Sequence, residues 1–263
     1  MTAQELPALV QVVVDGRTAV ITLTNERRRN SLTVPMVEQF IAELDRLEAD
    51  DAIGAIVVTG AGEAFCAGAD LGHLVGASAT DDRAEQSLRS IYVAFQRLHA
   101  CRIPTIAAVN GAAVGAGMNL ALVCDVILAS EDALFATRFL ELGLHPGGGH
   151  TWLLRQAVGA QAANALVLLN DDVGGRRAAE LGLAYECLGS AELMPRAMEL
   201  AAKAAGAPRG VSEKAKDSIR EAAGFVEYPP AIENEITKQL WSAQQEDFQQ
   251  RIAARMAPRP EGR

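Results

Sequence analysis

Two segments of small residues are the part of this chain best suited to chemistry. They are 64–70 (AFCAGAD) and 109–119 (VNGAAVGAGMN), and each follows an apolar run typical of a buried strand. Side chains this small leave the main chain open to a ligand. Ala116 lies between glycines at the start of an expected short helix, where free N–H groups attract anions, and Ala67 can offer a second N–H. Two such donors converging on one point would stabilise an oxyanion.

A purely structural interpretation competes with this one. Glycine and alanine also let a helix pack closely on a sheet, and for 109–119 alone the two interpretations are about equally good. Asp70 follows Gly-Ala, where a carboxylate is more often a turn or capping residue than a ligand. The presence of two such segments, each after a strand, favours a carbonyl-binding site over packing alone.

The elements that position these segments alternate between strands and helices. A hairpin is predicted over 10–15 and 19–24, followed by a helix with apolar positions from Met36 to Leu47 on one face. Strand, loop and helix then recur, which favours a parallel sheet with crossover helices. The strands are predicted over 55–59, 104–109 and 126–129, and the helices over 83–100, 118–123, 191–205, 211–223 and 232–256. The last of these is polar with sparse apolar residues, so we expect it to pack on a neighbouring subunit.

Composition limits the class of protein. The 263 residues suit one large domain, or one domain with a helical appendage, and the net charge of −9 argues against nucleic acid as a partner. The four cysteines form no CxxC pair and have no zinc spacing, so we expect reduced thiols and no metal. The sequence contains neither a signal peptide nor an apolar run of about 18 residues. These features predict a cytoplasmic protein with no membrane partner.

The chain resembles the crotonase (enoyl-CoA hydratase/isomerase) superfamily over nearly its whole length. The resemblance is carried by 64–71 (AFCAGADL), 104–125 (PTIAAVNGAAVGAGMNLALVCD) and 143–149 (GLHPGGG). It implies an α/β fold, with a crotonase-like ββα spiral over 1–200 and a C-terminal helical trimerisation region over 201–263. It also implies a homotrimer or dimer of trimers in fatty acid metabolism. The ligand would be an acyl-CoA thioester, with coenzyme A as part of the substrate and no other cofactor.

The resemblance also assigns roles to particular residues. It implies that Ala67 and Ala116 donate the two N–H groups of an oxyanion hole, and that Arg27 contacts the phosphates of CoA. A planar arginine guanidinium suits phosphate. For Arg28 and Arg29, a solvated basic turn is a competing interpretation. Further ligand contacts are expected at Gly68, Ala69, Asp70, Leu71 and Gly115.

Two positions depart from the pattern that the resemblance leads us to expect. The hydratases use two glutamates as general acid and base, and the corresponding positions here hold Asn119 and Phe139. Neither side chain transfers a proton near neutral pH, whereas a positioned acid or base contributes ~10²–10⁴ in rate. Glu141 is a weak candidate for a replacement. His145 and His150 flank the glycine turn, and each is more simply a loop residue.

These observations leave three functions open. The first is a nominal enoyl-CoA hydratase or isomerase, a lyase or isomerase that uses an unusual proton carrier. The second is a non-catalytic acyl-CoA-binding protein, which follows more directly from Asn119 and Phe139. The third, an interaction scaffold without a thioester ligand, leaves both small-residue segments without a purpose.

Overall fold

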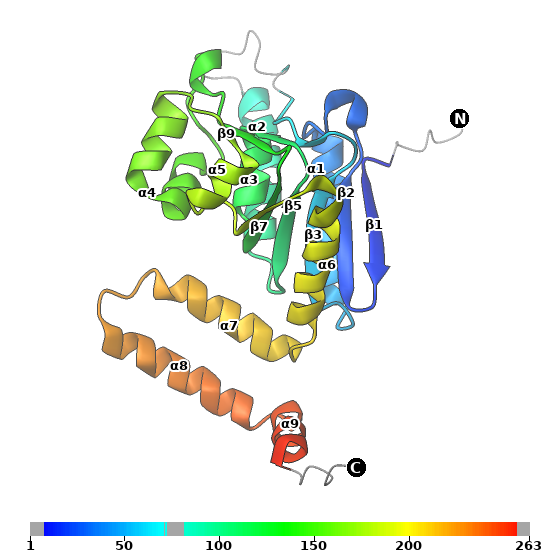
Figure 1. The fold of residues 1–263 in the computed structure, drawn as a ribbon, viewed down its shortest axis with the longest axis vertical. Coiled ribbons are helices and arrows are strands. Elements are labelled where there is room, and N and C mark those ends of the chain that lie inside the picture. The colour runs from blue at the N-terminus through cyan, green and yellow to red at the C-terminus, as the bar shows by residue number, and fades with distance from the viewer. Residues whose placement is uncertain (1–7, 71, 73–81, 257–263) are drawn as a thin grey trace.

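The computed structural model describes residues 8–70, 72 and 82–256 and has an α/β fold built on two sheets (Figure 1). The larger sheet has six strands in the order β1-β2-β3-β5-β7-β10. Its strands are β1 (Val10–Asp15), β2 (Thr18–Leu23), β3 (Ala55–Gly60), β5 (Thr105–Val109), β7 (Val126–Ser130) and β10 (Glu186–Leu188). β1 and β2 form the predicted antiparallel hairpin, and the other neighbouring strands are parallel.

The smaller sheet has four short strands in the order β4-β6-β8-β9. They are β4 (Ala64–Cys66), β6 (Ala112–Val114), β8 (Leu134–Ala136) and β9 (Val173–Gly174). Each short strand comes directly after a long strand of the larger sheet: β4 after β3, β6 after β5 and β8 after β7. The chain thus repeats a unit of one long and one short strand. The strands β4 and β6 lie within the two small-residue segments and were not predicted from the sequence. Strands of three residues are too short to show an alternating pattern in the sequence.

Helices cover both faces of the larger sheet. Successive strand residues point to opposite faces, so Ile56 and Val58 pack in the main core with α1 and α2, whereas Ala55 and Val57 pack against α6. Gly54 lies so close to Ala205 of α6 that a Cβ there would approach within 2.8 Å of its Cα. The helices of this part are α1 (Val34–Ala49), α2 (Asp82–His99), α3 (Ala116–Leu122), α4 (His150–Leu168), α5 (Gly175–Glu180) and α6 (Ser190–Ala205), with 3-10 turns at Glu26–Arg28 and Leu140–Leu142.

The last three helices extend away from the sheets (Figure 1). They are α7 (Arg209–Ala222), α8 (Tyr228–Ala243) and α9 (Glu246–Met256). The helix predicted over 232–256 is thus two helices, and α8 begins before Pro229 because proline is tolerated in the first turn of a helix. The boundary expected between residues 200 and 201 falls inside α6, whose Ala201 and Ala205 are buried against the sheet.

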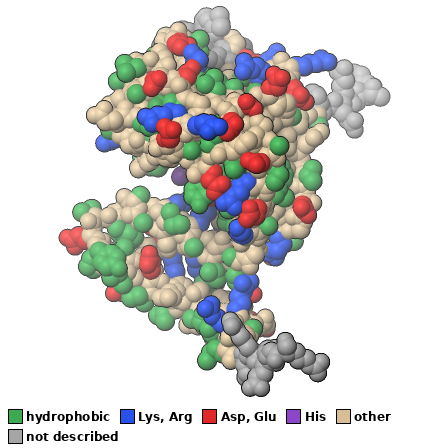
Figure 2. All heavy atoms as spheres, in the orientation of Figure 1, with side chains coloured by type: hydrophobic (Ala, Val, Ile, Leu, Met, Phe, Trp, Pro, Cys, Tyr) green, Lys and Arg blue, Asp and Glu red, His purple; other side chains and the backbone are tan. Residues whose placement is uncertain are grey.

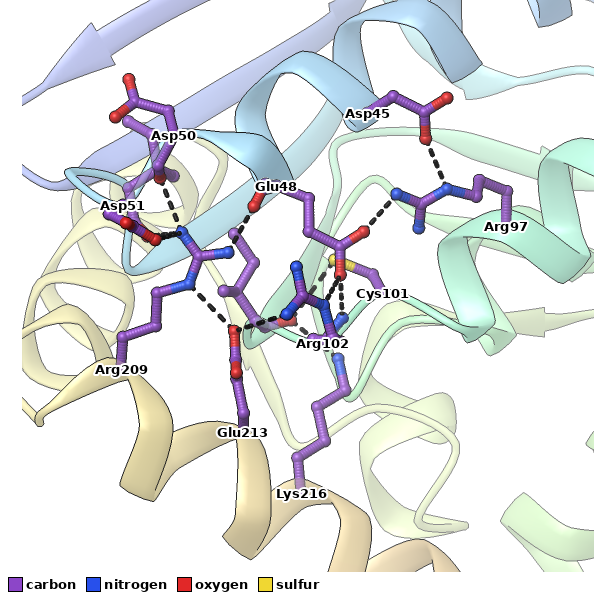
Figure 3. Close-up of polar contacts among 12 residues, drawn as sticks. Asp45, Glu48, Asp50, Asp51, Arg97, Cys101, Arg102, Arg209, Glu213 and Lys216 are labelled. Atoms are coloured by element: carbon purple, nitrogen blue, oxygen red, sulfur yellow. Dashed lines mark hydrogen bonds and ion pairs between the residues drawn. The ribbon is translucent and has the colours of Figure 1, made fainter.

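A network of ion pairs anchors α7 to the body of the molecule (Figure 3). Glu48 at the end of α1 pairs with Arg97 and accepts the backbone N–H of Arg102 at 2.8 Å. Burial alone would raise the pKa of Glu48, but these hydrogen bonds and the Arg97 charge outweigh it, so the pKa lies below its usual range. From α7, Arg209 donates to the carbonyl of Asp50 at 2.7 Å, and the buried Lys216 donates to that of Ile103 at 2.8 Å. The side chains of Arg209 and Lys216 therefore attach α7 to backbone carbonyls at the edge of the main domain.

None of the described helices is both long enough and apolar enough to cross a bilayer. All four cysteines are free thiols.

Candidate active site

Both small-residue segments line one cavity of about 200 Å³. The first segment contributes residues 67–69, and the second contributes 114–116 and Asn119. α2 and the stretch 137–147 supply the remaining walls: Leu88, Tyr92, Thr137, Arg138, Phe139, Leu142, Leu144, His145 and Gly147. No carboxylate side chain lines the cavity within the part of the chain that the structure describes.

The structure corrects the prediction that Ala67 donates to the ligand. The Ala67 N–H is already bonded to the carbonyl of Arg29 at 2.9 Å. The cause is that residues 67–70 run beside 29–32, where Leu32 N–H donates to Gly68 O at 2.8 Å and Asp70 N–H donates to Leu32 O at 2.9 Å. The neighbouring turn therefore uses the Ala67 amide, which is not available to a carbonyl in the cavity.

The same pairing leaves the N–H of Ala69 free. Ala69 forms a parallel bridge with Leu32, and in such a bridge the partner bonds the residues on either side of the central one. The N–H of Ala69 therefore faces away from Leu32 and donates to no described residue. The N–H of Ala116, the first residue of α3, is likewise unbonded among the described residues. Two unpaired backbone donors, one from each segment, thus belong to residues that line the same cavity.

Glycines bring the two segments together. A Cβ on Gly117 would lie 2.0 Å from the carbonyl oxygen of Cys66, and one on Gly68 would lie 3.1 Å from that of Val114. Gly68 and Gly115 have φ angles of 109° and 51°, which side-chain-bearing residues rarely adopt. The small residues therefore allow both close packing and an open main chain, so the two interpretations of the sequence are compatible.

Asn119 is buried at the cavity wall and held from two sides. Its Nδ2 donates to the carbonyl of Gly147 at 2.9 Å, which leaves Oδ1 as the acceptor for Nδ1 of His150 at 2.7 Å. His150 is 1% exposed, and burial lowers its pKa to about 4, so the imidazole is neutral near pH 7. The remaining ring nitrogen, Nε2, is buried and has no hydrogen-bond partner among the residues that the structure describes. His150 was not expected to take part in the site, and only its place beside the glycine turn hinted at it.

Phe139 lies close to both His150 and Gly115 of the second segment. Its ring lies 5.0 Å from the imidazole, centroid to centroid, in an edge-on arrangement. On its other side, the same ring would be 3.6 Å from a Cβ placed on Gly115. Phe139 therefore makes this wall of the cavity apolar.

Residues 15–257 match the family described as enoyl-CoA hydratase/isomerase. The chain belongs to the enoyl-CoA hydratase/isomerase family. It is 44% identical over 257 residues to the probable enoyl-CoA hydratase EchA14 of Mycobacterium tuberculosis, covering 96% of this chain and 98% of that one. It is also 29% identical over 237 residues to 4-chlorobenzoyl coenzyme A dehalogenase-2 of an Arthrobacter species, covering 89% and 86% of the two chains.

Solved structures confirm the predicted crotonase fold. An enoyl-CoA hydratase subunit I from Geobacillus kaustophilus superposes with a TM-score of 0.87 at 28% identity, covering 97% of this chain and 98% of that one. A probable enoyl-CoA hydratase/isomerase from Mycobacterium abscessus superposes with a TM-score of 0.86 at 30% identity. The family relationship thus extends over both the sheets and the C-terminal helices.

Glu141, the candidate for a replacement acid or base, does not line the cavity. Glu141 accepts a hydrogen bond from Arg138 at 2.6 Å, and Arg138 also pairs with Asp172. Its carboxylate is thus committed to an exposed ion pair, which does not support a role for Glu141 as the replacement base. His145 does line the cavity, but it is exposed, with Nδ1 2.7 Å from the carbonyl of Pro146.

The basic turn lies beside the first segment. Arg28 pairs with Asp70 at 2.6 Å, so Asp70 contributes to holding this turn. Arg27 is exposed and makes no ion pair with any residue that the structure describes. Leu71, the other expected ligand contact here, lies outside the described residues.

Tyr92 lines the cavity, although it was not predicted from the sequence to be a site residue. It lies on α2, within the helix predicted over 83–100, and its half-buried side chain lines the cavity. Burial raises the pKa of its hydroxyl, which is therefore a neutral donor at physiological pH. Trp152, by contrast, is exposed, packs edge-on against His99 and does not line this cavity.

Proposed function

We propose that this family member binds an acyl-CoA or enoyl-CoA thioester and holds the thioester oxygen with the N–H groups of Ala69 and Ala116. The observation that carries the proposal is the pair of unpaired backbone donors on residues that line one cavity. Preorganised donors of this kind stabilise a carbonyl oxygen that gains negative charge, and losing one typically costs ~10²–10³ in rate. Family membership supports the ligand class, since the relatives' names refer to CoA thioesters.

Hydration of an enoyl thioester is the reaction that the name of the mycobacterial relative suggests. It needs a proton donor and acceptor near the double bond, and each usually contributes ~10²–10⁴ in rate. Here the cavity has Asn119 and Phe139 at the two positions where the sequence led us to expect glutamates. We therefore expect hydration to be slow, with binding of the thioester retained.

A second candidate function is non-catalytic binding of acyl-CoA. The specific observation in its favour is that the described residues place no carboxylate on the cavity wall. A cavity that polarises a carbonyl but moves no proton would sequester the thioester rather than transform it.

One experiment distinguishes these functions. Purified protein is titrated with a saturated acyl-CoA by calorimetry, and loss of conjugated-thioester absorbance is followed with a trans-2-enoyl-CoA of equal length. Binding with slow turnover supports the enzyme, and binding without turnover above the uncatalysed rate supports the binder. Absence of binding to either thioester would contradict the proposed function itself.

We infer that the phosphates of CoA bind at the exposed Arg27, next to the first segment. The neighbouring Arg28 is less available because it pairs with Asp70. The protein as a whole is acidic, with a net charge of −9, so an anionic ligand needs a local basic group of this kind. An Arg27→Ala variant should weaken acyl-CoA binding more than binding of the corresponding acyl-pantetheine, which lacks these phosphates.

We also propose that the C-terminal helices pack against other copies of the chain, in a trimer or dimer of trimers. They carry large exposed apolar side chains, which appear as green spheres over the lower part of the molecule in Figure 2. Ile219 is 76% exposed, Val226 99% and Tyr228 78%. Apolar surface of this extent usually marks an interface. Light scattering should give a mass three or six times that of the monomer, and a monomeric mass would contradict the proposal.

A further inference from the structure

We propose that the cavity selects a thioester whose acyl group carries a ketone oxygen on carbon 3, held by the hydroxyl of Tyr92 and the side-chain N–H of Asn119. The inference rests on the proposed function, because it takes the thioester oxygen to lie at Ala116. It goes further by naming the acyl group.

Several polar side chains line the cavity, and they differ in whether they are already bonded. The hydroxyl of Thr137 already donates to the carbonyl of Leu166 at 2.9 Å, and the charge of Arg138 is balanced by its ion pairs with Glu141 and Asp172. The Tyr92 hydroxyl forms no hydrogen bond with any described residue.

Asn119 is a second uncharged donor on the cavity wall. Its Nδ2 uses one hydrogen on Gly147, so the second N–H remains.

The amide of Asn119 is fixed in orientation. Because Nδ2 faces the carbonyl of Gly147 and Oδ1 accepts from His150, the amide cannot flip without losing both hydrogen bonds. The group that remains available on nitrogen is therefore a donor. A site built in this way prefers a ligand atom that accepts hydrogen bonds.

Tyr92 and Asn119 approach the same pair of glycines. A Cβ on Gly147 would lie 2.1 Å from the Tyr92 hydroxyl oxygen, and a Cβ on Gly148 would lie 2.8 Å from Nδ2 of Asn119. Both donors therefore lie against consecutive residues of one turn, in a cavity whose other free walls are largely apolar. They form a local polar spot.

The distance along α3 relates this spot to the thioester. Ala116 and Asn119 are three positions apart in one helix, and both line the cavity. Side chains with this spacing lie ~5–6 Å apart on one face of a helix. If the thioester oxygen is held at Ala116, the polar spot is reached a few bonds further along the acyl chain. An oxygen on carbon 3, two bonds from the thioester carbon, satisfies this condition.

The chemistry of the two donors favours a ketone over other groups at that position. A ketone oxygen has two lone pairs and can accept from both donors at once. A saturated chain would bury the two donors without partners, and such unpaired polar groups discriminate strongly between ligands. We expect a preference of at least about tenfold for the 3-oxoacyl thioester over the saturated one.

The test compares CoA thioesters of equal length with the full-length protein. Affinities for 3-oxohexanoyl-CoA, 3-hydroxyhexanoyl-CoA and hexanoyl-CoA are measured by calorimetry for the wild type, Tyr92→Phe and Asn119→Leu. Tyr185→Phe is the matched control, since Tyr185 is exposed and lies outside this cavity. We expect the wild type to prefer the 3-oxo ligand, both cavity variants to lose most of that preference, and the control to keep it.

A spectroscopic measurement separates recognition from a loss of fold. The infrared band of a ¹³C-labelled carbon-3 carbonyl should move to lower frequency when the ligand binds to the wild type, and move less in Tyr92→Phe.

Equal affinity for all three thioesters, or an unchanged preference in both variants, would overturn the inference while leaving the proposed function in place. Failure of the wild type to bind any of the three would overturn both.

Discussion

The imidazole of His150 and the side-chain amide of Asn119 are joined by a buried hydrogen bond of 2.7 Å. This contact links the start of α4 to α3, and it fixes the tautomer of the histidine because Oδ1 of Asn119 has to accept. The other ring nitrogen then carries a lone pair that no described residue satisfies. A buried acceptor without a partner is costly, so the arrangement is maintained at the expense of stability.

Acidification should destabilise the protein through His150. Its pKa is about 4 in the folded state, against about 6.5 for an unperturbed histidine. The unfolded chain therefore takes up the proton first as the pH falls, and stability is lost between these two values. Between pH 7 and pH 5 the loss from this residue amounts to about 2 kcal/mol. Urea unfolding at both pH values should show a smaller loss in His150→Gln than in the wild type.

The exposed His145 provides the control for that experiment. His145→Gln should lose as much stability as the wild type on acidification, since it leaves the buried His150 unchanged. An identical loss in the wild type and in His150→Gln would mean that His150 is not held neutral by burial.

Restoring carboxylates should restore proton transfer. In Asn119→Glu combined with Phe139→Glu, hydration of a trans-2-enoyl-CoA should rise by about 10² or more, because each acid or base typically contributes at least that much. The rate is measured from the loss of conjugated-thioester absorbance, alongside acyl-CoA binding and unfolding of the variant. A folded, binding-competent double variant with no gain in hydration would show that the cavity is shaped for another reaction.

Gly117 should be intolerant of even one methyl group. A Cβ there would meet the carbonyl oxygen of Cys66 at 2.0 Å, so the first segment must move away from α3. We expect Gly117→Ala to weaken acyl-CoA binding by at least about tenfold, since displaced donors lose their alignment. Gly174→Ala is the matched control, with a φ of −75° and its nearest neighbour at 3.8 Å. Comparable affinities of the two variants would argue against a role for this close contact.

Removing the charge of Glu48 should destabilise the anchoring of α7. Its side chain is 7% exposed and binds Arg97 and Arg102, so Glu48→Gln removes the buried carboxylate that compensates the charge of the partly buried Arg97. We expect a loss of about 2–3 kcal/mol in unfolding free energy. The exposed pair of Glu43 with Arg46 offers a comparison, and Glu43→Gln should cost less than about 1 kcal/mol. Equal effects in denaturant titrations would mean that the network contributes no more than a surface pair.

Much of the fold was predictable because its signals are local. β3 is a run of apolar β-branched residues, and α1 has apolar residues on one face with Pro35 in its first turn. The short strands β4 and β6 were missed because three residues carry no periodic pattern. The break between α8 and α9 was missed as well, since no glycine or proline marks it in the sequence.

The site was predictable in its location but not in its details. The small residues identified both segments that line the cavity. Which amide is free could not be deduced, because it depends on the pairing of residues 67–70 with 29–32, which are distant in the sequence. For the same reason the bond between Asn119 and His150, and the position of the Tyr92 hydroxyl, follow only from the tertiary structure.

A crystal structure of the protein with a bound, unreactive acyl-CoA analogue tests the central claim most directly. We expect the thioester oxygen to lie about 2.7–3.1 Å from both the Ala69 nitrogen and the Ala116 nitrogen. In the same structure Ala67 should remain bonded to Arg29. A thioester oxygen that bonds to only one of the Ala69 and Ala116 amides, or to neither, would show that these two residues do not form the oxyanion hole.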